Sequence, residues 1–255
     1  MALLSFAGSP HGGSQKHLPE WDSQPRITPR AIIDHSIVGS AAEAWRMFRD
    51  RSVLESHFIV RGRRSGTADG HIWQLMDTDR QADANLNANR YAISIETEDD
   101  GDPDRQPWTR AQLESLIWLH AAIRREHPTI PNRRSRSCAD PGGHGYHTLH
   151  GAPSCWTPVA KSCPGTVRKR QWLEVLLPAY LSEQGDDDMP FSEAELRSIV
   201  RDEVRHALVT RPGQDADAGS LFSKVEDIQG GVDRIEPAVK EIKAAVVVPP
   251  PPPSP

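Results

Sequence analysis

The sequence predicts an α/β fold: a central β-sheet flanked by helices, followed by a helical C-terminal region. Between residues 30 and 181, short apolar strand patterns alternate with amphipathic helix patterns, which is typical of a sheet covered by helices. After residue 182 only helical periodicity and proline-rich sequence remain. A chain of 255 residues has room for one medium-sized domain with less compact flanks.

Four segments have the composition of strands. Residues 31–34 lead to His35, and residues 57–60, 71–76 and 91–96 are rich in β-branched, aromatic and other apolar side chains. Residues 91–96 are nearly all apolar or small, which predicts a central strand that is buried on both faces.

Three helices are predicted around these strands. Residues 40–50 place their apolar side chains near one face, and Thr109 is suited to cap a longer helix over residues 110–127. Residues 166–181 predict a closing helix. Between the last two, residues 128–158 contain five prolines among many Gly, Ser and His, which predicts a long functional loop.

The domain organisation follows from changes in composition. We expect a flexible N-terminal tail over residues 1–21, a folded domain over residues 22–182, and an acidic linker over residues 183–190. Residues 191–245 have helical and heptad periodicity, and residues 246–255 form a proline-rich tail. The heptad seam needs a partner, which could be a helix of the same chain, a second copy in a homo-oligomer, or a ligand outside the chain.

Charge and hydropathy exclude several classes of protein. Residues 183–255 carry 8 Lys or Arg against 15 Asp or Glu, a net charge of −7, which argues against nucleic acid as a partner. No stretch approaches the roughly 18 consecutive apolar residues that a membrane span needs. The first residues lack the basic region of a secretory signal peptide. Three cysteines are too few for a disulfide scaffold.

One cluster of residues carries recognisable chemistry. It combines residues 143–165, which are rich in His, Gly and Cys, with the Asp-His-Ser sequence at 34–36. A hydrolytic zinc site needs three protein ligands and an open position, and His35, a histidine among residues 144–150 and Cys163 could supply them. From the spacing alone, the histidines could equally be surface loop residues.

Four motifs in order resemble the type 2 N-acetylmuramoyl-L-alanine amidase family, which includes the animal peptidoglycan recognition proteins. They are the strand ending at Asp34-His35-Ser36, the Ser-His-Phe-Ile-Val strand with its following Asp-Gly turn, the strand ending at Glu96, and Gly-Tyr-His together with Lys-Ser-Cys-Pro-Gly. The match covers roughly residues 26–181. Within the family, the sequence around Gly-Tyr-His and Lys-Ser-Cys-Pro-Gly is most similar to that of actinobacterial phage endolysins. The resemblance implies a central mixed sheet flanked by helices.

The resemblance also implies the site residues. The zinc ligands would be His35, His147 and Cys163, with His147 chosen because it follows a Gly-Tyr pair; His144 and His150 are nearby competitors. Lys161, two residues before Cys163, would stabilise the oxyanion of the tetrahedral intermediate.

The general base is the remaining assignment. Some family members carry a tyrosine where this chain has Ser56, whereas others use the glutamate that corresponds to Glu96. We therefore expect Glu96 to be the base. Glu98 and Asp99 are expected to be solvated neighbours, His57 a core residue, and Trp156 a candidate wall of a substrate groove.

The expected activity is zinc-dependent hydrolysis of the amide between N-acetylmuramic acid and L-alanine in peptidoglycan. Alternatives are a non-catalytic peptidoglycan-binding module, which tends to lose the ligand at Cys163, or a bacterial amidase that recycles or remodels the cell wall. As a phage endolysin, the protein would be made in the host cytoplasm without a signal peptide and would act on the cell wall after release. Residues 22–182 would then be the zinc amidase catalytic domain, and the heptad region over residues 191–245 would serve association or binding to a cell-wall component.

Overall fold

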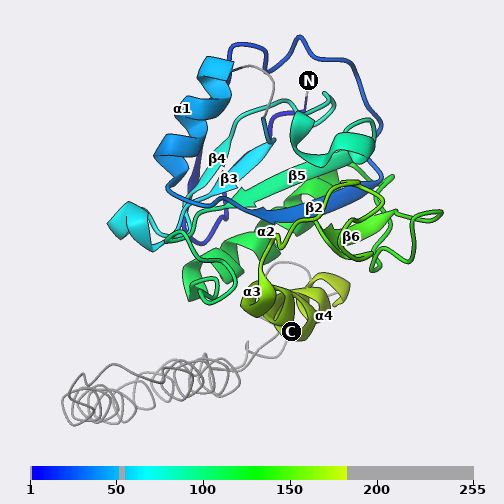
Figure 1. Ribbon diagram of the computed structural model, residues 1–255. Helices are drawn as coiled ribbons and strands as arrows, with labels where there is room; N and C mark the ends of the chain where they lie inside the picture. Colours follow the sequence, from blue (N-terminus) through cyan, green and yellow to red (C-terminus); the bar gives the residue numbers. More distant parts are fainter. Residues whose placement is uncertain (1, 52–54, 183–255) are drawn as a thin grey trace, which may run out of the picture. The chain divides into compact units, whose positions relative to one another are not determined.

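The computed structural model describes residues 2–51 and 55–182, which form a helix-flanked sheet (Figure 1). The six strands are β1 (Gly13–Gln15), β2 (Ala31–Ser36), β3 (Phe58–Val60), β4 (Ile72–Gln74), β5 (Ala92–Thr97) and β6 (Gly143–Tyr146). The helices are α1 (Ala41–Arg51), α2 (Arg110–Glu126), α3 (Thr166–Gln171) and α4 (Leu177–Leu181), with 3₁₀ turns at Arg63–Ala68 and Asp83–Ala88. A π-helical turn, Trp172–Leu176, joins α3 to α4. The predicted linker, heptad region and proline-rich tail lie outside the described residues.

The strands form one mixed sheet in the order β1-β4-β3-β5-β2-β6. The β3–β4 pair is antiparallel and every other neighbouring pair is parallel. Strand β5 lies inside the sheet, and five of its six side chains are buried, as its apolar sequence predicts. The predicted α/β class with a central mixed sheet is therefore confirmed.

Two layers of helices cover the opposite faces of the sheet (Figure 1). On one face, Ile32, Ile93 and Ile95 pack against α2 and the helical segment from α3 to α4. On the other face, Ile59 and Trp73 pack against α1. Side chains alternate between the faces of a strand, so Asp34 points to the α2 side and His35 to the α1 side.

Helix α2 begins where the sequence predicts. The Thr109 hydroxyl accepts a hydrogen bond from the Gln112 backbone N–H, and the Gln112 side chain accepts one from the Thr109 N–H. This capping box satisfies two backbone donors that would otherwise lack partners at the start of the helix. No helix among the described residues is long and apolar enough to cross a membrane.

The prediction of a flexible tail over residues 1–21 is wrong. Strand β1 pairs in parallel with β4, Leu18 is buried against the α1 side, and the Ala2 N–H donates to a carboxylate oxygen of Asp77 at 2.7 Å. Leu4 and Leu18 pack into the cores on the two faces of the sheet, and backbone hydrogen bonds to the sheet edge hold the polar residues between them in place.

The predicted loop over residues 128–158 contains strand β6, which sequence analysis missed. Its residues are Gly-His-Gly-Tyr, and glycine has little intrinsic preference for a strand. At Gly145 a Cβ atom would lie 2.3 Å from the Trp156 ring, so the glycine permits this close packing. Trp156 is fully buried there and does not line a groove.

Candidate functional site

Three predicted site residues meet at the carboxyl ends of adjacent strands. His35 in β2 pairs in register with Glu96 in β5, and His147 directly follows β6, with its N–H donating to the Asp34 carbonyl at 3.1 Å. The ends of parallel strands form a natural crevice because the chain leaves the sheet there. The fold thus brings together residues that are separated by more than a hundred positions in the sequence.

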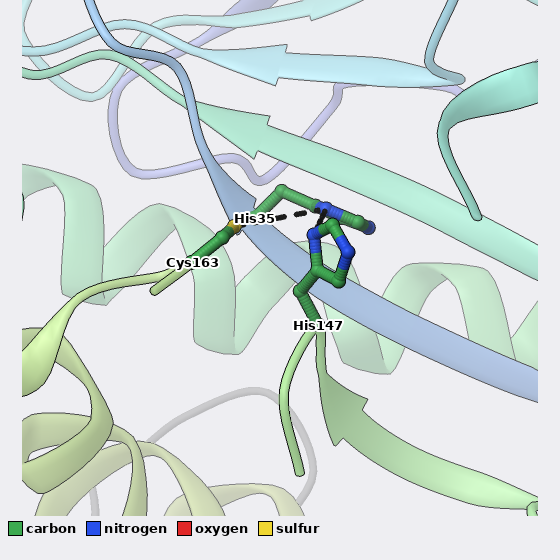
Figure 2. A group of neighbouring side chains, drawn as sticks. All are labelled: His35, His147 and Cys163. Atoms are coloured by element: carbon green, nitrogen blue, oxygen red, sulfur yellow. Dashed lines mark hydrogen bonds between the residues drawn. The ribbon is translucent and has the colours of Figure 1, made fainter. Parts of the chain in front are cut away.

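Cys163 completes the group (Figure 2). Its Sγ accepts a hydrogen bond from the Ser36 N–H at 3.2 Å and lies 3.8 Å from His35 Nδ1, while His35 Nδ1 and His147 Nδ1 are 3.0 Å apart. The three ligand atoms all lie within 4.8 Å of one another, and no other such group of three is present in residues 2–51 and 55–182.

These distances fit a tetrahedral zinc ion. With Zn–N bonds of about 2.0 Å and a Zn–S bond of about 2.3 Å, two nitrogens lie about 3.3 Å apart and nitrogen and sulfur about 3.6 Å apart. The observed separations of 3.0 Å and 3.8 Å are close to both values. His147 Nε2 is buried and has no hydrogen-bond partner among the described residues.

Asn85 orients the His35 ring. His35 Nε2–H donates to Asn85 Oδ1 at 2.7 Å, so His35 Nδ1 carries the lone pair and faces His147 and Cys163. A hydrogen bond of this kind fixes the tautomer of a metal-binding histidine. Sequence analysis missed Asn85, because nothing in its local sequence marks it as a neighbour of His35.

The electrostatics suit metal ligands. Burial lowers the pKa of His35 to about 3, with a further contribution from His147; burial and then Lys161 lower that of His147 to about 4. Both imidazoles are therefore neutral, as metal binding requires. Burial, followed by the neighbouring Glu96, raises the pKa of the Cys163 thiol, so a thiolate at this position needs a cation beside it.

Glu96 lies beside the group as the prediction for the base requires. Its Oε1 is 4.0 Å from His35 Nδ1, and its Oε2 is buried without a hydrogen-bond partner among the described residues. Burial, with Asp99 adding like charge, raises the pKa of Glu96 to about 8. A carboxyl with a pKa near neutrality can both accept and donate a proton during catalysis.

Lys161 and the group share one groove of about 470 Å³. Apolar side chains form part of its wall, and Lys161, Glu96, Glu55 and Asp83 supply the charged groups. Lys161 is exposed, and it is close enough to His147 to lower the pKa of that imidazole. The groove therefore combines the candidate ligands, an acid or base and a cation.

The structure separates His147 from its competitors. His144 is buried on the α2 side, where its ring contacts His120 at 2.8 Å and Asn132 at 3.1 Å. His150 contacts the Ser135 hydroxyl at 3.2 Å. Neither joins the group of His35 and Cys163. His57, predicted to be a core residue, is fully buried and hydrogen-bonded to Ser94.

Glu98 and Asp99 are not solvated neighbours, contrary to the prediction. Glu98 accepts hydrogen bonds from the backbone N–H groups of Ala41 and Gly62, and Asp99 Oδ1 accepts from the Gly39 and Gly101 N–H groups. Both side chains are buried, and their hydrogen bonds to backbone N–H groups fix the loops at the end of β5.

Arg168 was also missed. It is buried beneath the site, and its guanidinium donates to the hydroxyls of Ser36 and Thr97 at 2.7 Å and 2.9 Å. The Ser36 hydroxyl in turn donates to the Pro164 carbonyl at 2.9 Å. Arg168 therefore ties α3 to the ends of β2 and β5, beside the chain that carries Cys163.

Solved structures with similar folds include amidases, phage endolysins and recognition proteins. The N-acetylmuramoyl-L-alanine amidase LysC from Clostridium intestinale URNW has 16% sequence identity and a TM-score of 0.46, over 65% of this chain and 97% of that chain. The Ph2119 endolysin from Thermus scotoductus MAT2119 bacteriophage Ph2119 has 15% identity and a TM-score of 0.42, over 66% and 100%. Drosophila peptidoglycan recognition protein SD has 12% identity and a TM-score of 0.42, over 63% and 94%.

Among curated proteins, none matches this chain. The family model described as N-acetylmuramoyl-L-alanine amidase matches residues 25–166, which is more than half of the chain and includes all five predicted site residues. The family resemblance expected from the four motifs is thereby confirmed, and the chain belongs to the type 2 N-acetylmuramoyl-L-alanine amidase family.

Proposed function

We propose that the chain is a zinc-dependent N-acetylmuramoyl-L-alanine amidase, which hydrolyses the amide between the lactyl group of N-acetylmuramic acid and L-alanine in peptidoglycan. The observation that carries this proposal is the group of His35, His147 and Cys163 in one groove with Glu96 and Lys161. Three ligands leave a fourth position of a tetrahedral ion open, which distinguishes catalytic from structural zinc sites.

Each residue has a role in this reaction. A bound zinc ion supplies Lewis-acid polarisation of the scissile carbonyl and activates water. Glu96 accepts a proton from the attacking water and passes it to the amide nitrogen of L-alanine as the C–N bond breaks. Lys161 places its ammonium beside the oxygen that becomes negative in the tetrahedral intermediate. Asn85 and Arg168 hold His35 and the Cys163 segment in position.

A non-catalytic peptidoglycan-binding module is the second candidate. Such a module needs the groove but neither a thiol ligand nor a buried carboxyl with a raised pKa. This chain has both, in Cys163 and Glu96. These two residues favour the enzyme. The endolysin role, with action on the wall after release from the host cytoplasm, belongs to the same proposal and rests on the motif resemblance.

The proposal is tested by incubating the purified chain with isolated cell walls. We expect new amino groups, identified as N-terminal L-alanine, without new reducing sugar ends. A chelator should abolish their release, and added zinc should restore it. Release of reducing ends alone, or full activity after verified removal of the metal, would show that the proposed reaction is wrong.

A further inference from the structure

A second polar cluster lies in the groove and takes no part in the proposed reaction. Glu55 precedes β3, Asp83 begins the 3₁₀ turn that also carries Asn85, and both line the groove together with His35 and Cys163. The amidase family resemblance assigns neither carboxylate a role. Their presence beside the candidate metal site therefore needs a separate explanation.

Glu55 is buried without any compensating contact. Its relative exposure is 0%, and neither carboxylate oxygen has a hydrogen-bond partner among the described residues. The next two residues are firmly held: the Ser56 hydroxyl donates to the Ser94 carbonyl at 2.9 Å, and His57 Nε2 contacts the Arg80 carbonyl at 2.8 Å. The neighbouring residues thus hold Glu55 at the wall of the groove. Its buried carboxyl group has no hydrogen-bond partner there, which lowers the stability of the folded chain.

The surroundings of Glu55 make this cost larger. Burial raises the pKa of Glu55 to about 7, and the nearby carboxylates of Asp83 and Glu20 add to the increase. Within the described ranges, no Lys or Arg forms an ion pair with any of these three carboxylates. Asp83 accepts one hydrogen bond, from Asn89 Nδ2 at 3.1 Å. This side of the groove therefore has an excess of acceptors and negative charge.

The chemistry of a fitting ligand follows from that excess. An anion would be repelled, and an apolar group would leave the Glu55 oxygens without donors. A chelated metal ion is disfavoured, because among the described residues only His35, His147 and Cys163 bring ligand atoms close enough to hold one. A primary ammonium group offers three N–H donors and a positive charge, which matches two adjacent carboxylates.

We propose that Glu55, with Asp83, binds a primary ammonium group of the peptidoglycan stem peptide: the side-chain amine of a diamino acid while the amide lies at the metal site, or the N-terminus of the peptide once the amide has been broken. This inference rests on the proposed function, because it assumes that a stem peptide occupies the groove. It predicts a preference for stem peptides that carry a free amine, either on the side chain of a diamino acid or at the N-terminus freed by cleavage.

Binding of a product peptide tests the inference independently of hydrolysis. The probe is L-alanyl-γ-D-glutamyl-L-lysine, compared with its ε-acetylated and α-acetylated forms, and its Kd for the full zinc-loaded chain is measured calorimetrically at pH 8. We expect acetylation of one amine to weaken binding about tenfold or more, the effect of losing a charge-assisted pair. The acetylated peptide that binds more weakly identifies which amine is bound.

Variants connect this effect to the subsite. In Glu55→Gln, acetylation of that amine should change Kd less than about twofold, and Asp83→Asn should reduce the effect by a smaller factor. Glu174→Gln, which alters an exposed glutamate on the π-helical turn, should behave like the unaltered chain. If Glu55→Gln fails to fold, the acetylation effect on the Kd of Asp83→Asn still tests the subsite.

Three results would overturn the inference. The first is an acetylation effect that is equally large in Glu55→Gln and in the unaltered chain. The second is no measurable binding of the free-amine peptide, and the third is no effect of either acetylation on Kd. The same chain is assayed for the formation of new N-terminal L-alanine in cell walls. Hydrolysis without amine-dependent binding rejects only the subsite, whereas amine-dependent binding without hydrolysis rejects only the proposed activity.

Discussion

Asp34 and His35 are neighbours in β2, yet their surroundings on the two faces of the sheet are opposite in character. On the α2 side, Asp34 accepts hydrogen bonds from Trp172 Nε1 at 2.8 Å and from the Tyr180 hydroxyl at 3.3 Å, and contacts His120 Nε2 at 2.9 Å. On the α1 side, buried polar atoms lack partners among the described residues: His147 Nε2, Glu96 Oε2, Asn85 Nδ2 and both carboxylate oxygens of Glu55.

This difference separates stability from function. The Asp34 cluster is closed: Tyr180 stacks on His120 with ring centroids 3.8 Å apart, and His120 contacts His144. A satisfied polar network of this kind fixes how α2 and α4 pack on the sheet. The His35 side leaves donors and acceptors unpaired in a groove, an arrangement that costs stability and is suited to binding an ion and a substrate. Substitutions on the two faces should therefore affect different properties.

The largest effect is expected at Glu96. Glu96→Gln preserves the shape of the side chain but removes the base, so hydrolysis of cell walls should slow by about 10² to 10⁴ fold while the zinc content stays unchanged. The matched control is Asp100→Asn, a nearby exposed carboxylate, which should keep full activity. A normal rate in Glu96→Gln would place the base elsewhere.

Lys161 should have the next largest effect. Lys161→Met removes the cation that faces the developing oxyanion, and we expect a loss of about 10² to 10³ fold in kcat with zinc retained. Lys169→Met is the control, because Lys169 also lowers the pKa of His147 but does not line the groove. Equal losses in the two variants would reduce the role of Lys161 to a general effect of charge.

On the opposite face, the effect should appear in stability. Asp34→Asn brings an NH₂ group toward the donors of Trp172 and Tyr180, so we expect the free energy of unfolding to fall by about 3 kcal/mol in denaturant titrations. Asp140→Asn, which weakens solvent-accessible ion pairs with Arg133 and Arg136 that are only partly buried, should cost less than about 1 kcal/mol. If Asp34→Asn were as stable as the unaltered chain, the closed cluster would not be a source of stability.

The smallest effect is expected at Glu55, where the substitution should increase stability, in contrast to Asp34→Asn. The pKa of Glu55 rises from 4.5 to about 7 on folding, so the folded chain holds the proton more tightly between these values and stability falls as the pH rises through this window. Glu55→Gln should therefore raise Tm by a few °C at pH 8, with a much smaller change at pH 5. Glu174→Gln should change neither. A lower Tm for Glu55→Gln at pH 8 would mean that the carboxylate has a stabilising partner.

The sequence predicts the centre of this fold better than its edges. Strands β2 and β5 are six residues each and begin with buried, mostly apolar residues that include two isoleucines, and α2 has its own capping box, so local patterns suffice. Strands β1 and β6 are three and four residues long and rich in glycine and polar side chains. They are strands only because β4 and β2 provide backbone partners, and this tertiary effect leaves no periodic signal.

The same distinction holds for the site. Ordered motifs predicted that His35, Glu96, His147, Lys161 and Cys163 belong together, and the structure places all of them along one groove. Asn85, Arg168 and Glu55 could not be predicted, because their importance depends on what lies beside them after folding. The choice of His147 over His144 also has a simple geometric reason: His144 lies within β6 with its side chain on the α2 face, whereas His147 lies beyond the end of the strand.

The most direct test of the account is the metal content of two cysteine variants. Cys163 is a candidate ligand, whereas Cys155 lies in the same region of the chain but outside the group of three. By atomic absorption, the unaltered chain and Cys155→Ala should each bind about one zinc ion, and Cys163→Ala should bind almost none and lose hydrolysis of cell walls. Full zinc content and activity in Cys163→Ala would contradict the assignment of His35, His147 and Cys163, on the α1 side of the sheet, as a metal site.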